Sequence, residues 1–340
     1  MSSGRSRKPP AASTRPARDG SKPSGRRGAR PAEPRAPESR SGPKVGFISL
    51  VGRPNAGKST LLNRLVGTKI AIVSDKPQTT RTRILGVRNY PAGQVIYLDT
   101  PGIHRPLHRM NVRMVDAALD TIREVDVVGL VVDASEAAGA GDRYVQQRLQ
   151  QAACPVVLVL NKIDLVPRPQ LLPMIAALGR DETFAEIVPV SARTGENVDR
   201  LEEVFLRRLP EGEALYPPDY LTDQPERAIV AEIVREQVLA HTRQELPFST
   251  AVIVDRFEEP DAGNLMRLYC SILVERESQK PIVVGRAGAM IKRIGTEARL
   301  AIERFFSVRV YLDLRVKVRA GWREDERMLD TLGLPQLPRK

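Results

Sequence analysis

Residues 52–59 of this 340-residue chain combine two glycines, a lysine and a serine at a spacing that suits phosphate binding. The segment fits the pattern G-x-x-x-x-G-K-S/T, whose backbone N–H groups wrap around phosphates at the N-terminus of a helix. We expect Lys58 to reach the β- and γ-phosphates of a nucleoside triphosphate and Ser59 to ligate Mg²⁺. The expected phosphate-binding residues are Gly52, Arg53, Pro54, Asn55, Ala56, Gly57, Lys58, Ser59 and Thr60.

A second motif, D-x-x-G, starts at Asp99, directly after the apolar run Val95–Leu98. A carboxylate at the end of a strand is able to hold Mg²⁺ through a water molecule. The Gly102 N–H is able to approach a γ-phosphate, because glycine allows the backbone to come close. Taken alone, this motif is usually just a turn. Its position at the end of an apolar run is what makes a functional role worth considering. Its expected nucleotide contacts are Asp99, Thr100, Pro101, Gly102 and Ile103.

The third motif, N-K-x-D, ends in a carboxylate that is able to select the base. Asp164 offers two acceptors to the N1–H and N2–H₂ donors of guanine, whereas adenine has no such pair. Each charge-assisted hydrogen bond contributes about 1.5–3 kcal/mol, so the motif favours GTP and argues against an ATPase. We expect Asn161 to tie this loop to the phosphate loop and the stem of Lys162 to cover the base. The expected base contacts are Asn161, Lys162, Ile163 and Asp164, with backbone support from Ser191, Ala192 and Arg193.

Each motif follows a short apolar run, and amphipathic segments separate the runs. We expect strands at Val45–Val51, Val95–Leu98, Val127–Val132, Val156–Leu160 and Ile187–Val190. We expect helices near Ser59–Val66, Met110–Arg123, Asp142–Gln151, Gln170–Leu178 and Val198–Leu209. Runs rich in Val, Ile and Leu with little alternation are typical of strands buried on both faces. Residues 44–209 are therefore predicted to form an α/β P-loop GTPase domain, with a mostly parallel sheet, helices on both faces and the ligand at the carboxyl ends of the strands.

The pattern changes after a proline-rich linker at residues 210–225. Helices are expected at Glu226–Glu245 and Ala289–Phe306, and a short apolar run lies at Ile282–Val284. The expected strands are Phe248–Phe257, Leu265–Glu275 and Val308–Val318. The order α-β-β-α-α-β predicts a small α+β domain over residues 226–334, followed by a C-terminal tail at residues 335–340.

The net charge of +12 is spread unevenly along the chain. Residues 1–44 hold twelve Lys and Arg against three Asp and Glu, whereas residues 45–340 hold 41 against 38. Residues 1–43 are rich in Pro, Gly, Ser and Ala, so we expect a disordered basic tail. It is either a solvated tail without a specific role or a tether to RNA or acidic lipid. A prediction of RNA binding by the folded part must therefore rest on local charge.

Composition also limits the compartment. Cys154 and Cys270 are the only cysteines and lie in apolar runs, which argues against a disulfide framework and for a reducing compartment. The sequence has neither a signal peptide nor an apolar run long enough to cross a membrane.

Together, the nucleotide motifs and four C-terminal segments resemble the Era family, in the TrmE–Era branch of Ras-like GTPases. The segments are Ile-Leu-Val-Glu-Arg-Glu at 272–277, Gly-Arg-Ala-Gly at 285–288, Ile-Gly-Thr-Glu-Ala-Arg at 294–299 and Val-Lys-Val-Arg-Ala-Gly-Trp at 316–322. The similarity runs from about residue 44 to about residue 334. It identifies the C-terminal domain as similar to a type II KH domain.

The resemblance implies a role in assembly of the small ribosomal subunit, with the KH domain bound to the 3′ end of small-subunit ribosomal RNA. It also implies a cytoplasmic monomer that contacts the inner face of the cell membrane peripherally. The alternative is a GTP-gated membrane- or protein-interaction switch that does not bind RNA directly.

The family also carries a switch I element, matched here by Gln78, Thr79, Thr80 and Arg81. The resemblance implies that one threonine ligates Mg²⁺ when the γ-phosphate is present; we favour Thr80, and Thr79 stays open. Ile103 stands where many Ras-like enzymes have a water-orienting glutamine, so we predict slow intrinsic turnover. Catalysis is expected to rest on Lys58, Mg²⁺, Thr80 and backbone groups such as the Gly102 N–H.

Two further hypotheses concern hydrolysis. Asn55 stands where potassium-stimulated relatives have a cation-binding asparagine, so K⁺ is a candidate cofactor; the alternative is that Asn55 only bonds within its loop. His104, Arg105 and His108 lie in the expected switch II region, where a solvated loop is favoured over a catalytic histidine.

A G-x-x-G loop in a basic setting carries the RNA prediction. Such a loop clamps about four nucleotides in KH domains, because glycines let phosphates approach a helix N-terminus. Residues 276–323 hold twelve Lys and Arg against four Asp and Glu. Ala287 stands where many relatives have a basic residue, which weakens the expected phosphate contact. The expected RNA-binding residues are Gly285, Arg286, Ala287, Gly288, Lys292 and Arg293, above an apolar floor of Val283, Val284, Ile291 and Ile294.

Overall fold

The computed structural model describes residues 42–336, except for residues 77, 105, 107, 138, 151, 180–182, 243–245, 261–262 and 335. Apart from Gly42 and Pro43, the expected N-terminal tail lies outside the described residues. So does the expected C-terminal tail apart from Gln336, and so does Arg105. No helix in the described part of the chain combines the length and the apolar composition that a membrane span needs.

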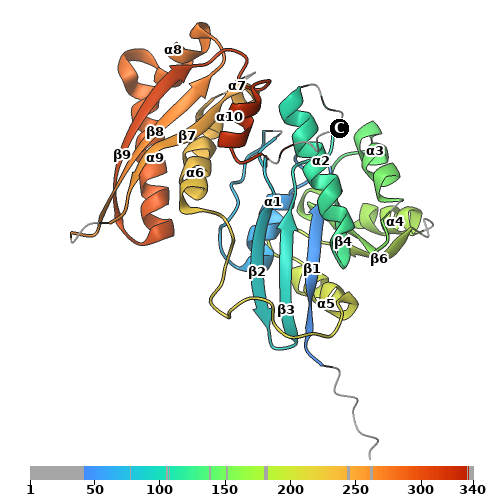
Figure 1. Cartoon of the computed structure of the whole chain (residues 1–340). Helices are drawn as coiled ribbons and strands as arrows, with labels where there is room; N and C mark the ends of the chain where they lie inside the picture. The colour runs from blue at the N-terminus through green and yellow to red at the C-terminus, as the bar shows by residue number, and fades with distance from the viewer. Residues whose placement is uncertain are drawn as a thin grey trace, which may run out of the picture. The chain divides into compact units, whose positions relative to one another are not determined.

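A six-stranded sheet forms the centre of the N-terminal domain (Figure 1). Its strands are β1 (Lys44–Val51), β2 (Ile84–Tyr90), β3 (Gly93–Asp99), β4 (Val127–Asp133), β5 (Val156–Asn161) and β6 (Phe184–Pro189). They lie in the order β2-β3-β1-β4-β5-β6, and every neighbouring pair is parallel except β2 and β3. The prediction of a mostly parallel sheet is confirmed.

Strand β2 is absent from the sequence-based prediction. Its first four residues are buried, but Arg88 and Asn89 are exposed and interrupt the apolar run. A tight connection through Pro91 and Ala92 leads into β3, so β2 forms an antiparallel hairpin at the edge of the sheet. The edge strand is buried in part, which is why it lacks the continuous apolar run of its parallel neighbours.

Helices cover both faces of this sheet, and all but α4, which has no buried residue, carry the expected amphipathic pattern. They are α1 (Lys58–Val66), α2 (Arg109–Arg123), α3 (Ala140–Leu149), α4 (Arg168–Leu178) and α5 (Val198–Arg208), with a short 3₁₀ turn, η1 (Ile163–Leu165). Apolar residues of α1 and α5 join one core layer, and those of α2 and α3 join the other. The three expected motifs thus follow β1, β3 and β5 at one edge of the sheet.

Residues 210–225 run against the sheet that precedes them. The Leu221 carbonyl accepts from the Val87 N–H of the edge strand at 2.9 Å. Gln94 of β3 accepts from the Leu215 and Tyr216 N–H groups through its side-chain oxygen. The backbone of this segment therefore has defined hydrogen-bond partners on β2 and β3.

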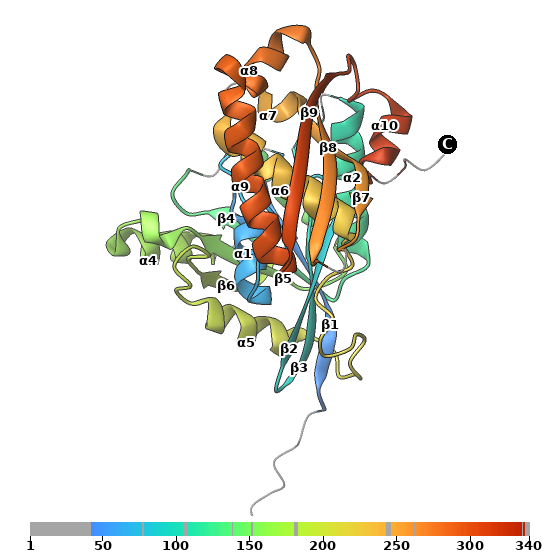
Figure 2. The ribbon, with the colours of Figure 1, turned by 90° about the vertical axis from the view of Figure 1, so that its left-hand side faces the viewer.

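The C-terminal domain places helices on one face of a three-stranded sheet (Figure 2). Its elements are α6 (Glu226–His241), α7 (Leu246–Ser249), β7 (Ala251–Glu258), β8 (Leu265–Val274), η2 (Glu277–Gln279), α8 (Lys280–Val284), η3 (Arg286–Gly288), α9 (Ala289–Phe306), β9 (Arg309–Val318) and α10 (Glu326–Thr331). Strand β8 pairs antiparallel with β7 and parallel with β9. The main elements follow the expected order α-β-β-α-α-β.

Two boundaries in this domain differ from the prediction. The strand expected to begin at Phe248 begins at Ala251, because Leu246–Ser249 forms a short helix instead. Helix α6 ends at His241, and residues 243–245 of the expected helix lie outside the described residues. Short helices of one turn have no apolar period long enough to be recognised in a sequence.

Candidate functional site

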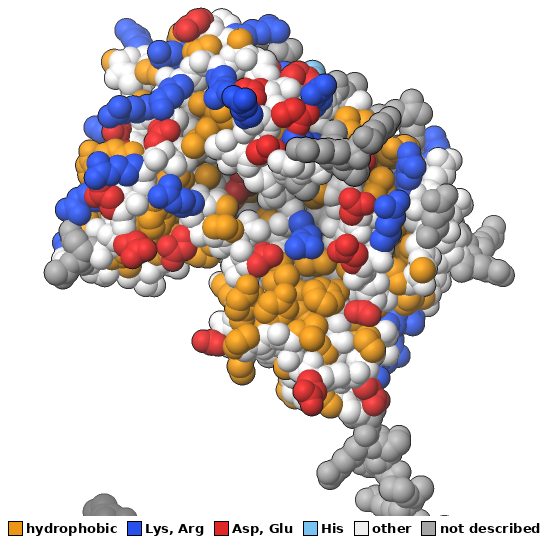
Figure 3. Space-filling model, in the orientation of Figure 1, with side chains coloured by type: hydrophobic (Ala, Val, Ile, Leu, Met, Phe, Trp, Pro, Cys, Tyr) orange, Lys and Arg blue, Asp and Glu red, His pale blue; other side chains and the backbone are white. Residues whose placement is uncertain are grey.

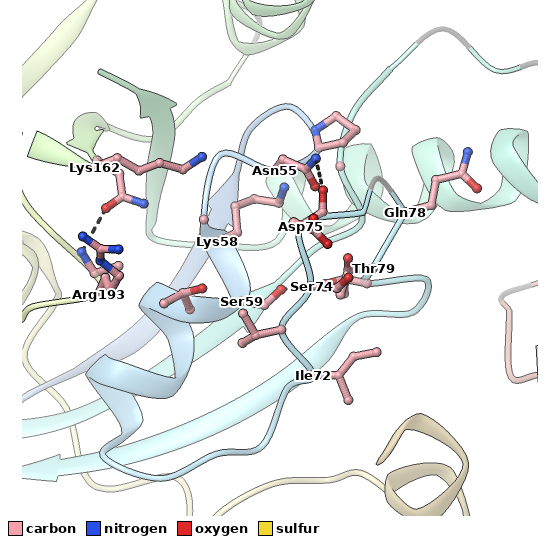
Figure 4. Close-up of a pocket in the computed structure, with 18 of the residues that line it drawn as sticks. Asn55, Lys58, Ser59, Ile72, Ser74, Asp75, Gln78, Thr79, Lys162 and Arg193 are labelled. Atoms are coloured by element: carbon pink, nitrogen blue, oxygen red, sulfur yellow. Dashed lines mark hydrogen bonds between the residues drawn. The ribbon is translucent and has the colours of Figure 1, made fainter. Parts of the chain in front are cut away.

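A cavity of about 560 Å³ lies at the carboxyl ends of the parallel strands, where the three motifs meet. Figure 4 shows side chains from the phosphate loop, switch I and the base loop around it. The expected site residues that line it are Pro54, Asn55, Gly57, Lys58, Ser59, Thr60, Gln78, Thr79, Thr80, Gly102, Asn161, Lys162, Asp164, Ala192 and Arg193.

The phosphate loop owes its shape to backbone conformations that favour glycine. Gly57 has a φ of 93°, and a Cβ there would lie 2.2 Å from the Asn161 Nδ2. The Lys58 ammonium folds back over the loop and donates to the Gly52 and Arg53 carbonyls at 3.2 and 3.0 Å. Burial lowers the pKa of Lys58 to about 8, against an opposing effect of the Asp99 carboxylate. The lysine is thus packed where the negative charge of phosphates would favour its protonated form.

Three oxygen-bearing side chains converge beside Lys58. The Ser59 hydroxyl donates to the Asp99 Oδ2 at 2.7 Å, and the Thr80 hydroxyl donates to the same atom at 3.0 Å. The two hydroxyl oxygens lie 2.7 Å apart. Burial raises the pKa of Asp99, and Lys58 opposes that rise. The Asp99 Oδ1 is buried without a hydrogen-bond partner among the described residues.

This donor set suits Mg²⁺, which prefers oxygen ligands and often keeps several of its waters. The orphaned Asp99 oxygen and the two hydroxyls provide one charged and two neutral oxygens in one place. Thr79 does not join them, because its hydroxyl donates to the Lys76 carbonyl at 2.6 Å. The sequence left either threonine as the candidate Mg²⁺ ligand. The geometry favours Thr80, whose hydroxyl faces Asp99.

Asn161 connects the three loops around the cavity. Its amide donates to the Ala56 carbonyl of the phosphate loop at 2.8 Å. Its carbonyl oxygen accepts from the Ala192 N–H at 3.0 Å. The expected tie between the base loop and the phosphate loop is present, and it extends to the loop that follows β6.

Asp164 presents an ionised carboxylate at the far end of the cavity. Its Oδ1 accepts from the Ser191 hydroxyl at 2.6 Å, and its Oδ2 pairs with the Arg193 guanidinium at 2.7 Å. The Ser191 hydrogen bond is the main cause of a lowered pKa of Asp164, and Arg193 adds to it. The carboxylate is therefore charged at neutral pH and already accepts N–H and O–H donors.

Sequence reasoning missed Asp133, the last residue of β4. This buried carboxylate accepts from the Lys162 ammonium at 2.6 Å and from the Ser135 N–H and hydroxyl. The Lys162 and Ser135 side chains offset burial and lower the pKa of Asp133. The rule that ligands gather at the carboxyl ends of parallel strands would have pointed to it, since it pairs with Asn161 in the register of β4 and β5.

Some expected contacts do not reach the cavity. Ile103 is fully buried in the core, and its N–H donates to the Gly52 carbonyl. Arg53 turns away to pair with Glu136 and Asp142. The others outside the lining are Gly52, Ala56, Asp99, Thr100, Pro101, Ile163 and Ser191, which form the wall behind it or support its loops.

Switch I contacts the C-terminal domain. The buried Arg81 donates to the Thr250 carbonyl at 2.8 Å and lies 5.5 Å from the centre of the Trp322 ring. Arg235 of α6 is buried too and donates to the Thr79 carbonyl and, at 3.5 Å, to that of Gln78. The side chain of Gln78 meets His104 at 3.3 Å. His108 instead pairs with Glu324 at 3.1 Å.

The G-x-x-G loop joins α8 to α9. Gly285, Ala287 and Gly288 all have positive φ, and a Cβ on Gly285 would lie 2.5 Å from the Met290 Cβ. Arg286 and Lys292 are exposed beside it, whereas the exposed Arg293 pairs with Glu297 at 3.0 Å. Of the expected apolar floor, Val283 and Ile294 belong to the core, and Val284 and Ile291 are half-buried.

Two family profiles match the chain, one for each domain. A profile described as 50S ribosome-binding GTPase matches residues 47–162, and a KH domain profile matches residues 245–323.

Full-length relatives extend this match across both domains. The chain is 51% identical to a GTPase Era of Geobacter metallireducens over 290 residues, which cover 85% of this chain and 97% of the relative. It is 46% identical to a GTPase Era of Heliobacterium modesticaldum over 293 residues, 86% of this chain and 98% of the relative.

Two solved structures share the whole arrangement. The crystal structure of Era in complex with MgGDPNP and nucleotides 1506–1542 of 16S ribosomal RNA superposes with a TM-score of 0.84 at 42% identity, over 86% of this chain and 100% of that one. An Aquifex aeolicus Era variant bound to GDP and AlF₄⁻ gives 0.83, also at 42% identity, with the same coverage.

Proposed function

Because the chain belongs to the Era family of GTPases, we propose that it is a GTP-hydrolysing switch that binds the 3′ end of small-subunit ribosomal RNA during assembly of that subunit. The observation that carries the nucleotide part is the link through Asn161, which sets Lys58 and Asp164 around one cavity. The RNA part is supported by the G-x-x-G loop and by the relative solved with 16S RNA.

Each end of the cavity suits one end of GTP. Lys58 and the backbone N–H groups of the phosphate loop hold the phosphates. The Ser59 and Thr80 hydroxyls would ligate Mg²⁺ and Asp99 would hold it through a water, and the ion would neutralise phosphate charge there. At the other end the N1–H and N2–H₂ donors of guanine replace the present donors to Asp164, while Lys162 covers the base.

Hydrolysis relies on charge and backbone groups. Ile103 is packed in the core, so no side chain at that position orients the attacking water. Backbone N–H groups near Gly102 are left to position it. Gly102 lies close to the phosphate loop, where a Cβ on it would be 2.7 Å from the Pro54 nitrogen. We therefore expect slow intrinsic turnover.

Potassium is a candidate second cation at Asn55. Its amide donates to the Asp75 carbonyl at 2.8 Å and so joins the phosphate loop to the segment that leads into switch I (Figure 4). The carbonyl oxygen of the same side chain is the ligand that we propose for K⁺. Equal GTP turnover in K⁺ and Na⁺ buffers would show that Asn55 acts only within its loops.

Base selectivity tests the nucleotide assignment. The change Asp164→Ala removes both acceptors for guanine, and each charge-assisted bond is worth about 1.5–3 kcal/mol. We expect GTP affinity to fall about a hundredfold or more while ATP affinity changes little. Competition of GTP and ATP against a fluorescent guanine nucleotide measures both. A variant that keeps the full preference for guanine contradicts the assignment.

RNA binding tests the second half of the proposal. The change Arg286→Asp places a negative charge beside the G-x-x-G loop and is expected to weaken binding of a short single-stranded RNA from the 3′ end of small-subunit rRNA. The salt dependence of binding should flatten as well. Fluorescence anisotropy in the presence of GTP and of GDP measures both, and unchanged binding would locate the groove elsewhere.

A cytoplasmic monomer with peripheral contact to the inner face of the cell membrane completes the proposal. The alternative, a GTP-gated membrane or protein switch without direct RNA binding, predicts the opposite pattern. Anionic vesicles would then bind in a nucleotide-dependent way, and RNA would not.

A further inference from the structure

The sheet of the C-terminal domain turns one face toward its helices and the other toward solvent. Residues of β9 alternate between the two faces. Val310, Leu312, Leu314 and Val316 pack into the core with α8 and α9. The residues between them form the outer face, together with their neighbours on β7 and β8. In Figure 2 the strands lie to the right of α9, which corresponds to the front in the view of Figure 1, so Figure 3 shows this outer face toward the viewer.

Two tyrosines occupy the middle of the outer face. Tyr269 of β8 and Tyr311 of β9 have ring centroids 5.9 Å apart, with ring planes inclined at 60°. The Arg256 guanidinium lies 5.8 Å from the centre of the Tyr269 ring. Tyr311 is 50% exposed, which is unusual for an aromatic side chain in a folded domain. Beyond the tyrosines the face is covered, because Leu273 packs against Trp322 and its neighbours.

Charged side chains surround the tyrosines, and cations outnumber anions. The cations are Arg256, Arg267, Arg309, Arg315 and Lys317, and the anions are Asp255, Glu258 and Asp313. Figure 3 shows Lys and Arg side chains spread over this part of the surface with acidic ones between them.

The cations of this face extend further into solvent than the anions. The side chains of Arg256 and Arg315 are each 70% exposed, whereas those of their partners Glu258 and Asp313 are 29% and 26% exposed. Exposed ion pairs of this kind contribute at most about 1 kcal/mol. The guanidinium groups are therefore free to exchange their partner for a phosphate at little cost.

We propose that this outer face is a second RNA-binding surface, which takes single-stranded nucleotides that extend beyond the G-x-x-G loop. Exposed aromatic rings stack on bases, and guanidinium groups beside them pair with phosphates. Acidic lipid headgroups would also pair with the cations, but they have no flat π-face that stacks on the tyrosine rings as a base does. The combination of rings and arginines therefore favours RNA over acidic lipid.

Strand β9 lies between the two RNA sites. It is an edge strand of the sheet, since the order is β7-β8-β9. Its core-facing residues pack beside the helices that carry the G-x-x-G loop, and its outward residues include Tyr311 and Arg315. Tyr311 lies near the C-terminal end of α9, because the neighbouring Val310 N–H donates to Glu303 at 3.0 Å. RNA that leaves the loop at the other end of this 18-residue helix must therefore follow it for ~27 Å before it reaches the tyrosines. The proposal rests on the proposed function, because it extends the same bound RNA.

Two RNA lengths and four variants test the surface. The short RNA has about six nucleotides, matched to the about four that a KH loop clamps. The extended RNA has about twenty, enough to continue onto an aromatic platform. The variants of the full-length protein are Tyr311→Ala and Arg315→Gln on the outer face, Tyr311→Phe as the conservative control, and Arg123→Gln on the exposed surface of α2 as the charge control.

We expect Tyr311→Ala to lower the affinity for the extended RNA about fivefold or more, which is the effect of losing one stacked base. The affinity for the short RNA should not change. Tyr311→Phe should retain binding because it keeps the ring. Arg315→Gln should lower the slope of log affinity against log salt for the extended RNA by about 0.7, the value for one phosphate contact on a single strand, and Arg123→Gln should not.

Equal affinity of the wild type and Tyr311→Ala for the extended RNA overturns the proposal. If the Arg286→Asp variant nevertheless loses binding of the extended RNA, the proposed function stands and only the proposal of a second surface fails. Loss of binding to anionic vesicles by Tyr311→Ala, with RNA binding intact, overturns it in favour of lipid. Failure of the wild type to bind either RNA overturns both proposals.

Discussion

Lys162 adopts a left-handed backbone conformation, with a φ of 65°, and its ammonium is fixed by a carboxylate from the neighbouring strand. The left-handed conformation is unfavourable in free energy for any residue that has a side chain. Surrounding contacts must therefore hold Lys162 in place. Asp133, which pairs with Asn161 in the register of β4 and β5, provides one such contact to the Lys162 ammonium at 2.6 Å. The side chain that we propose to cover the base is therefore positioned before a nucleotide arrives.

We predict that Asp133→Asn weakens GTP and GDP to a similar extent, by about three- to tenfold, since it removes one charge-assisted hydrogen bond from Lys162. The base side of the nucleotide is common to both ligands. Titration with fluorescent GTP and GDP analogues measures the two affinities.

The matched control for Asp133 is Asp120→Asn, because Asp120 is an exposed residue of α2 paired with Arg123. It should change neither affinity. A loss confined to GTP in Asp133→Asn would place the effect of this carboxylate at the γ-phosphate instead of the base.

Among the elements, α6 of the C-terminal domain contacts the segment that contains switch I. Arg235 donates to the backbone of Gln78 and Thr79, directly before Thr80, and Glu232 neutralises it at 2.6 Å. The next residue, Glu236, accepts from the Val73 N–H at 2.9 Å. A helix of the C-terminal domain thus fixes two points of the segment that carries the proposed Mg²⁺ ligand.

We predict that Arg235→Ala weakens GTP by about tenfold and GDP much less, because the Thr80 ligand is needed only when the γ-phosphate is present. Stopped-flow measurement of both nucleotides gives the ratio. Since the alanine change leaves Glu232 without its partner, Arg235→Lys serves as a milder second variant.

The control on the same helix is Arg227→Ala, whose guanidinium lies 5.6 Å from the ring of Phe257. Equal losses for GTP and GDP in Arg235→Ala would indicate a general destabilisation of the domain. A melting curve of each variant separates that outcome from a specific effect on switch I.

At the scale of the whole molecule, most of the net positive charge lies in the N-terminal segment that precedes the folded domains. Residues 2–43 hold eleven Lys and Arg against three Asp and Glu, while the rest of the chain is close to balance. Long-range attraction to polyanions follows net charge and is screened by salt. The basic tail and the specific surfaces are therefore expected to contribute to RNA binding in different ways.

We predict that removal of residues 2–43 leaves GTP turnover unchanged and reduces binding to unrelated single-stranded RNA, with a shallower salt dependence. A full-length variant with the eleven basic tail residues changed to glutamine is the matched control, because it keeps the length. Lower GTP turnover after truncation would show that the tail contributes to the enzyme itself.

The sequence alone determined the nucleotide site in outline. Parallel strands bring their carboxyl ends to one edge, so motifs that follow β1, β3 and β5 had to meet there, and the observed cavity lies at that edge. The G-x-x-G loop was recognisable for a similar reason, since Gly285 and Gly288 take positive φ values that other residues avoid.

Only the tertiary structure decided which side chains share the site. Thr79 and Thr80 are adjacent and chemically identical, yet packing turns one hydroxyl toward Asp99 and the other toward Lys76. Asp133 and Arg235 are 29 and 156 residues away from the residues they hold. Contacts over such separations follow from strand register and helix packing, for which a single sequence carries no local signal.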